Sequence, residues 1–110
     1  MTHRDLEVTK SGGRIDGLRV HFTVVFKTQH LNDEDITELC EQADSLLTWV
    51  DICEYLKRRI HLLIKNGRTV AMIHYTYEHG LRKQELDIIE HDCGQIVQQL
   101  AILISVFEDP

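Results

Sequence analysis

A run of histidine, tyrosine and glutamate side chains holds the groups best suited to chemistry in this sequence. The run consists of His74, Tyr75, Tyr77, Glu78 and His79. Alternate residues of a strand share a face, so His74 and Glu78 could form an acid–base pair on one side of a sheet. Strand tyrosines and histidines more often pack half-buried with their polar tips in water. We therefore assign no catalytic residue and take Tyr75, Tyr77 and His79 as candidate ligand-binding residues. The alternative is a small enzyme or ligand-binding protein with a pocket beside them.

Seven histidines invite a metal-site interpretation that their spacing does not support. They are His3, His21, His30, His61, His74, His79 and His91. No two stand in a His-x-x-x-His arrangement, and the chain has no Cys-x-x-Cys. His91-Asp92-Cys93 resembles a ligand run, but neighbours two apart on a helix do not converge on one ion. The sequence also has no phosphate-binding glycine loop or nucleophile turn, so we expect neither metal nor cofactor.

Charged residues cluster at two places. Asp33, Glu34, Glu38 and Glu41 form an acidic stretch that could dock on a basic protein surface, and we take them as binding candidates. A basic stretch follows, consisting of Lys57, Arg58, Arg59, Lys65 and Arg68. We interpret it as the complement of a helix dipole, although a nucleic-acid site there is a third possibility. The net charge of −6 argues against a sequence-independent nucleic-acid binder.

The composition is that of one soluble globular domain spanning residues 1–110. Hydrophobic residues make up 43% and charged residues 27% of the chain. The first five residues lead into polar sequence and show no signal-peptide pattern. No apolar run approaches the roughly 20 residues that span a membrane. Three cysteines without close pairs fit a reducing compartment. We expect a cytoplasmic protein without membrane contact.

The segment Asn32–Gly67 has the pattern of one long helix. Its apolar residues recur at steps of three or four: Ile36, Leu39, Ala43, Leu46, Val50, Cys53, Leu56, Ile60 and Leu63. Asn32 is a good N-cap, and Asn66-Gly67 is typical of a helix C-terminus. The segment therefore predicts a helix over 33–65. The β-branched and aromatic residues of 48–51 are its weak point, and a kink or break there is the alternative.

Three segments alternate as strands do. Residues 6–9 predict a short strand, and the glycines at 12, 13 and 17 predict a long hairpin loop. Residues 18–27 predict a strand with one apolar and one wet face. Residues 68–78 have two mixed faces, which indicates a central strand whose Tyr75 and Tyr77 reach a partly exposed surface.

The last third of the chain predicts an apolar helix. A seam at three-to-four spacing consists of Leu86, Ile89, Cys93, Ile96, Leu100, Leu103 and Phe107. We expect the helix to begin near Lys83; the alternative begins it at Asp92, with Gln95 completing a capping box, and makes 81–89 a fourth strand. Residues 96–107 are apolar nearly all round, so a second copy is needed to bury them. We expect a homodimer with this interface: Leu86, Ile89, Ile96, Leu100, Leu103 and Phe107.

Together these patterns predict an α+β fold with elements in the order β-β-α-β-α. In it, a small antiparallel sheet is packed on one face by the long helix and the C-terminal helix. The predicted function is that of a non-catalytic protein-binding module. A small dimeric regulator or inhibitor of the immunity or phage/viral accessory kind would have this size and charge. Its expected partners are a second copy and another protein rather than nucleic acid.

Overall fold

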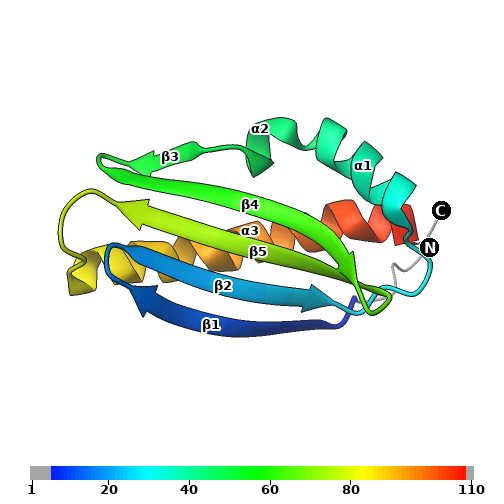
Figure 1. Ribbon diagram of the computed structural model, residues 1–110, viewed down its shortest axis with the longest axis horizontal. Helices are drawn as coiled ribbons and strands as arrows, with labels where there is room; N and C mark the ends of the chain where they lie inside the picture. The colour runs from blue at the N-terminus through cyan, green and yellow to red at the C-terminus, as the bar shows by residue number, and fades with distance from the viewer. Residues whose placement is uncertain (1–5, 109–110) are drawn as a thin grey trace.

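The computed structural model describes residues 6–108 and has an α+β fold built on one antiparallel sheet (Figure 1). The strands are β1 (Val8–Asp16), β2 (Arg19–Phe26), β3 (Val50–Cys53), β4 (Leu56–Lys65) and β5 (Arg68–Tyr77). The helices are α1 (Asp33–Gln42), α2 (Asp44–Leu47) and α3 (Lys83–Glu108). The sheet order is β1-β2-β5-β4-β3, so β5 lies in the middle, as predicted. The predicted α+β class is confirmed, but the predicted element order is wrong.

The hairpin of β1 and β2 is tighter than predicted. Strand β1 continues through both of its glycines to Asp16, and the two residues Gly17 and Leu18 turn the chain. Gly17 has φ 62°, a conformation that favours glycine at the first position of a two-residue hairpin turn. The register shifts between Gly12 and Arg14, and a Cβ on Gly12 would lie 2.8 Å from the carbonyl oxygen of His21. Gly12 therefore serves a bulge within the strand rather than a loop.

The predicted long helix is wrong beyond its first turns. Asn32 caps α1 as expected: its side chain accepts a hydrogen bond from the backbone N–H of Asp35, and the Asp35 carboxylate accepts one from the N–H of Asn32. The helices end at Leu47, just before the weak point, and β3 and β4 follow. Asn66 and Gly67 have φ values of 53° and 75° and join β4 to β5 in a two-residue hairpin. An Asn-Gly pair is as typical of such a turn as of a helix end.

Arg58 interrupts the apolar alternation that would have identified β4 as a strand in the sequence. The residues of β4 that face the core alternate, but an arginine occupies one of these positions: they are Leu56, Arg58, Ile60, Leu62 and Ile64. Arg58 is only 4% exposed, because its guanidinium pairs with Asp92 of α3. A charged residue at a core position removes the period-two signal and leaves the three-to-four spacing of the rest.

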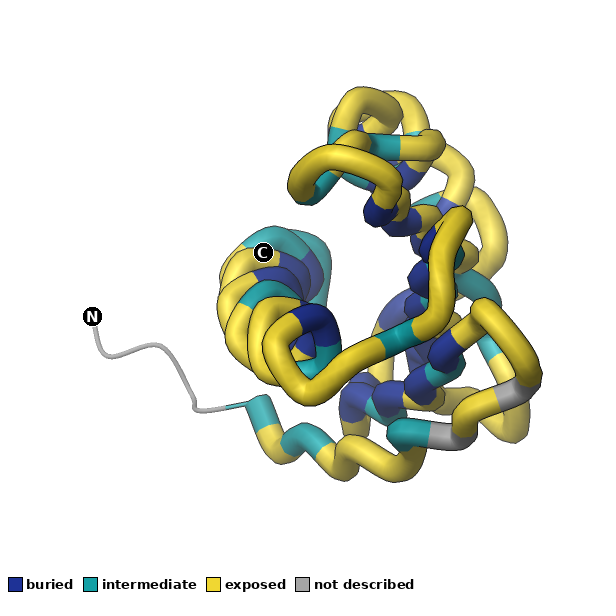
Figure 2. The backbone as a smooth tube through the Cα atoms, turned by 90° about the vertical axis from the view of Figure 1, so that its left-hand side faces the viewer, coloured by how far each residue is buried: buried dark blue, intermediate teal, exposed yellow. Residues whose placement is uncertain are grey.

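Helix α3 begins at Lys83, as predicted, and covers one face of the sheet (Figure 2). The buried residues of the strands and of α3 face each other across the core. Helices α1 and α2 lie beside β4, along the part of its edge that the short β3 does not pair with (Figure 1). Within the described residues, no helix is long and apolar enough to cross a membrane. Among residues 6–108, no helix covers the other face of the sheet.

The expected exposure of Tyr75 and Tyr77 is wrong, because both side chains face the core. Tyr75 is 1% and Tyr77 8% exposed. The Tyr75 hydroxyl donates to Oδ2 of Asp92 at 2.6 Å, and the Tyr77 hydroxyl donates to Oε1 of Glu85 at 3.1 Å. Asp92 also accepts two hydrogen bonds from Nη1 of Arg58, at 2.8 and 3.0 Å. These polar contacts fix the register of α3 on the sheet.

Candidate functional site

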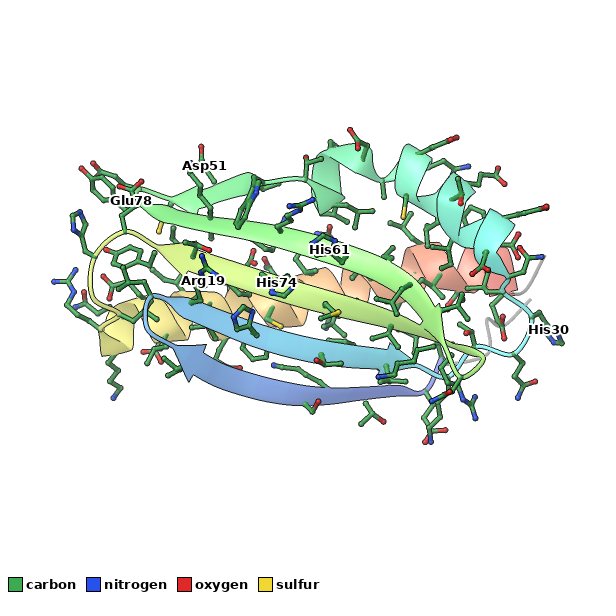
Figure 3. The ribbon with its side chains drawn as sticks, viewed as in Figure 1. Arg19, His30, Asp51, His61, His74 and Glu78 are labelled. Atoms are coloured by element: carbon green, nitrogen blue, oxygen red, sulfur yellow. The ribbon has the colours of Figure 1, made fainter. Side chains whose placement is uncertain are left out.

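The face of the sheet that α3 leaves open carries a grid of polar side chains. The outward residues of β2, β5 and β4 pair across the strands because all three alternate in register. From β2 to β4, the rows are Arg19–Thr76–Lys57, His21–His74–Arg59 and Thr23–Met72–His61. Figure 3 looks onto this face and shows Arg19, His61 and His74 over the strands, with α3 behind them. The pairing thus gathers cations and imidazoles at one place.

His21 and His74 are in direct contact at the centre of the grid. Their Nδ1 atoms lie 2.5 Å apart, so one ring must donate its proton and the other must accept it. The rings meet edge to face with centroids 4.7 Å apart, and the ring of His61 lies 5.5 Å from that of His74. Burial lowers the pKa of His74 below its ordinary value of 6.5, and charge on His21, His61, Arg59 and Arg19 lowers it further. His74 is therefore neutral at pH 7 and able to gain a proton as the pH falls.

The grid lies in a groove of about 620 Å³. Basic and aromatic residues predominate in its lining, which consists of Arg19, His21, Trp49, Tyr55, Lys57, Arg59, His61, His74, Thr76 and Glu78. Lys57 and Arg59 are exposed and form no ion pair with any side chain that the structure describes. Two acidic residues border these cations: Glu78 lines the groove, and Asp51 on β3 pairs across the strands with Lys57 (Figure 3). Such a groove can hold an anion by charge and by hydrogen bonds from the guanidinium and ammonium groups.

Charge is segregated between this groove and the helices. Acidic residues gather on the helices: Asp33, Glu34, Asp35, Glu38, Glu41, Asp44, Glu85, Asp87, Glu90, Asp92 and Glu108. Of the predicted basic stretch, Lys57, Arg59, Lys65 and Arg68 are exposed, and only Arg58 is buried toward α3. The net charge of −6 therefore conceals a basic face.

Two large aromatic side chains stand in the same groove. Trp49, between α2 and β3, is 50% exposed, and Tyr55, in the turn between β3 and β4, is 44% exposed. The ring of Tyr55 lies 4.7 Å from that of His79, edge to face. These rings offer flat apolar surfaces beside the cations.

The predicted ligand-binding residues do not form one pocket. Tyr75 is absent from the surface because its hydroxyl is bonded to Asp92, and burial together with that hydrogen bond raises its pKa. Tyr77 and His79 line a separate hollow of about 600 Å³ with Tyr55 and Arg82. His74 and Glu78, which the sequence placed on one face, both line the groove described above. The acidic candidates Asp33, Glu34, Glu38 and Glu41 are exposed along α1, away from the groove.

The predicted dimer residues lie mostly within the chain's own core. Ile89, Ile96 and Leu100 are 1%, 3% and 0% exposed. The other three pack against that core and are partly buried: Leu86, Leu103 and Phe107. These positions follow the seam of α3 that faces the sheet. The large apolar residues that α3 exposes are Ile88, Ile102 and Val106, and the last two are the most exposed, at 67% and 60%.

Within residues 6–108, His, Cys, Asp and Glu side chains do not gather in threes at a point that could hold a metal ion. His3 lies outside the described residues. The run His91-Asp92-Cys93 does not converge, since Cys93 is buried and Asp92 is bonded to Arg58.

Sequence reasoning missed most of the groove. It placed Arg19 and His21 on the wet face of their strand correctly, but the helix predicted for 33–65 put Lys57, Arg59 and His61 elsewhere. The alternation Lys57, Arg59, His61 was the available signal. Comparison of the chain with protein-family models, with curated proteins and with solved structures finds no match.

Proposed function

We propose that this protein is a non-catalytic binding protein that holds a polyanionic partner on the open face of its sheet. The observation that carries the proposal is the segregation of charge, which gives an acidic chain a basic groove around Arg19, Lys57 and Arg59. Concentrated positive charge on one face attracts and orients an anion even when the net charge of the protein is negative.

The groove suits binding better than turnover. Cations surround its imidazoles, so the protonated form of His74 is disfavoured until an anion arrives to compensate the charge. The partner of such a groove is a segment that carries several negative charges in a row. A small regulator that recognises an acidic segment of another molecule agrees with the size of the chain and with the predicted binding role.

Charge reversal in the groove tests the proposal. At pH 7 and low salt, the wild-type chain should be retained on immobilised heparin despite its net charge. Arg59→Glu should elute at clearly lower salt. Lys83→Glu is the matched control because it makes the same charge change at an exposed position on α3, outside the groove, and it should elute close to wild type. Failure of the wild type to bind, or equal losses for the two variants, would refute the proposal.

Self-association through α3 is a second, separate proposal. Ile102 and Val106 stand one helical turn apart and expose apolar surface on the side of α3 that faces away from the sheet. A two-fold dimer buries such a stripe against its own copy, which is the commonest way for a soluble protein to cover a self-complementary patch. This interface differs from the predicted one by using the outer side of α3.

A further inference from the structure

The groove exposes aromatic side chains as well as positive charge. Trp49 and Tyr55 are about half exposed, although large aromatic side chains gain most by burial. An acidic peptide or a sulfated sugar needs only the cations of such a groove. A base in a nucleic acid uses a ring as well, because every base has a flat face that can stack on an aromatic side chain.

Tyr55 is held in a backbone conformation that does not suit it. Its φ is 69°, in the left-handed region that favours glycine. Other hairpins of this chain place Gly17, Asn66 and Gly67 at positive φ, and asparagine tolerates this region better than tyrosine does. A non-glycine residue in this conformation costs about 1–2 kcal/mol. The turn geometry alone therefore does not explain Tyr55, whereas an aromatic ring at the edge of the groove does.

From these observations we propose that the groove binds single-stranded nucleic acid. The phosphates would lie against Arg19, Lys57 and Arg59, and bases would stack on Trp49 and Tyr55. This inference rests on the proposed function, because it names the polyanion that the basic face holds. An exposed sheet with rings and cations is suited to unstacked bases, whereas a duplex keeps its bases stacked inside.

The single tryptophan of the chain gives a direct readout, since Trp49 lines the groove. The wild-type protein is titrated at low salt with five probes: a twelve-nucleotide oligothymidylate, the same sequence as a duplex with oligoadenylate, thymidine monophosphate, polyglutamate and heparin. The single strand should bind most tightly and should quench Trp49 emission. Three phosphate contacts predict that the logarithm of its binding constant falls with the logarithm of salt with a slope of about −2.

Variants at Trp49 separate stacking from charge. Followed by the fluorescence anisotropy of a labelled strand, because the variant has no tryptophan, Trp49→Leu should weaken binding of the single strand about ten-fold, the loss expected for one stacked base. Its effect on heparin binding should be much smaller. Trp49→Phe keeps a ring and should recover most of the affinity. Circular dichroism should show both variants folded.

The other outcomes overturn the inference in distinguishable ways. If heparin binds and the single strand binds no better and quenches nothing, the inference fails while the proposed function stands. Tighter binding of polyglutamate would assign the groove to an acidic protein segment, and equal binding of the duplex would exclude strand selectivity. Equal affinity for thymidine monophosphate would make the ligand a free nucleotide rather than a strand. If none of the probes binds, both the inference and the proposed function fail.

Discussion

Arg58 carries a positive charge into the space between the sheet and α3. Its side chain is 5% exposed and that of its partner Asp92 is 15% exposed, so both ions are largely removed from water. The Asp92 carboxylate neutralises this charge and accepts two hydrogen bonds from Arg58 and a third from the Tyr75 hydroxyl. The Nε of Arg58 is buried without a partner within residues 6–108. A buried pair of this kind fixes one arrangement of helix on sheet, and it becomes costly when either partner is lost.

Removal of Asp92 should therefore be strongly destabilising. Asp92→Ala leaves the guanidinium of Arg58 buried and unpaired and should lower the free energy of unfolding by about 3–5 kcal/mol. Tyr75→Phe, which loses one hydrogen bond, should cost only about 1 kcal/mol. Urea denaturation measures both. The double variant Arg58→Met/Asp92→Ala should be more stable than Asp92→Ala alone, and a double variant less stable than the single one would contradict this account.

The depressed pKa of His74 makes polyanion binding depend on pH. The uncharged ring is favoured in the free protein, so the proton is taken up below the ordinary value of 6.5. A bound anion favours the charged ring, so affinity should rise as the pH falls from 7.5 to 5.5. Heparin affinity measured at both values should show this gain, and His74→Gln should reduce it. The same gain in the variant, or no gain in the wild type, would remove His74 from the site.

Glycine stabilises the fold at one position of a turn and destabilises it at one position of a helix. Gly67 has φ 75° in the hairpin between β4 and β5, and Gly94 lies within α3 where an added Cβ would meet nothing within 4 Å. Gly67→Ala should cost about 1–2 kcal/mol of unfolding free energy. Gly94→Ala should add up to about 1 kcal/mol, because alanine favours the helix. Opposite shifts of the urea midpoint are expected, and shifts of the same sign would be inconsistent with these backbone assignments.

Elements with a clean pattern were predictable from the sequence, and strand β4, whose alternation a buried arginine interrupts, was not. The alternation of β2, the N-cap Asn32 and the start of α3 near Lys83 all follow from local physics and are confirmed. At the start of α3, Glu85 lies three residues after Arg82 and accepts from its backbone N–H and its guanidinium, which lowers the pKa of Glu85 to about 2. This acidic residue was an unrecognised signal for that start.

Strand β4 depended on a contact that the sequence does not display. Arg58 occupies a core position only because Asp92 meets it from α3, 34 residues later. Asn66-Gly67 favours a helix end and a hairpin turn equally, so it did not correct the error. Without β4 the groove could not be predicted, because cross-strand pairing rather than sequence proximity brings Arg59 to His74 and His21.

At the scale of the whole molecule, binding is proposed at two surfaces of residues 6–108: the basic groove and the outer side of α3. For the second, light scattering after size-exclusion chromatography should give twice the 12.8 kDa of one chain. Replacing Ile102 and Val106 by glutamine should give a monomer. Thr37→Gln, an exposed change on α1, should leave the dimer intact. A wild type that stays monomeric at high micromolar concentration would dismiss self-association through α3.

The proposal that a polyanion binds in the groove is tested most directly by mapping which residues the polyanion contacts. Backbone amide signals of the isotope-labelled protein are followed by nuclear magnetic resonance during titration with a short heparin oligosaccharide at low salt. The largest shifts should fall on the outward residues of β2, β4 and β5 around His21, Arg59 and His74, with little change along α1 or α3. Shifts confined to the helices, or spread evenly over the surface, would contradict the assignment of the open sheet face as the binding surface.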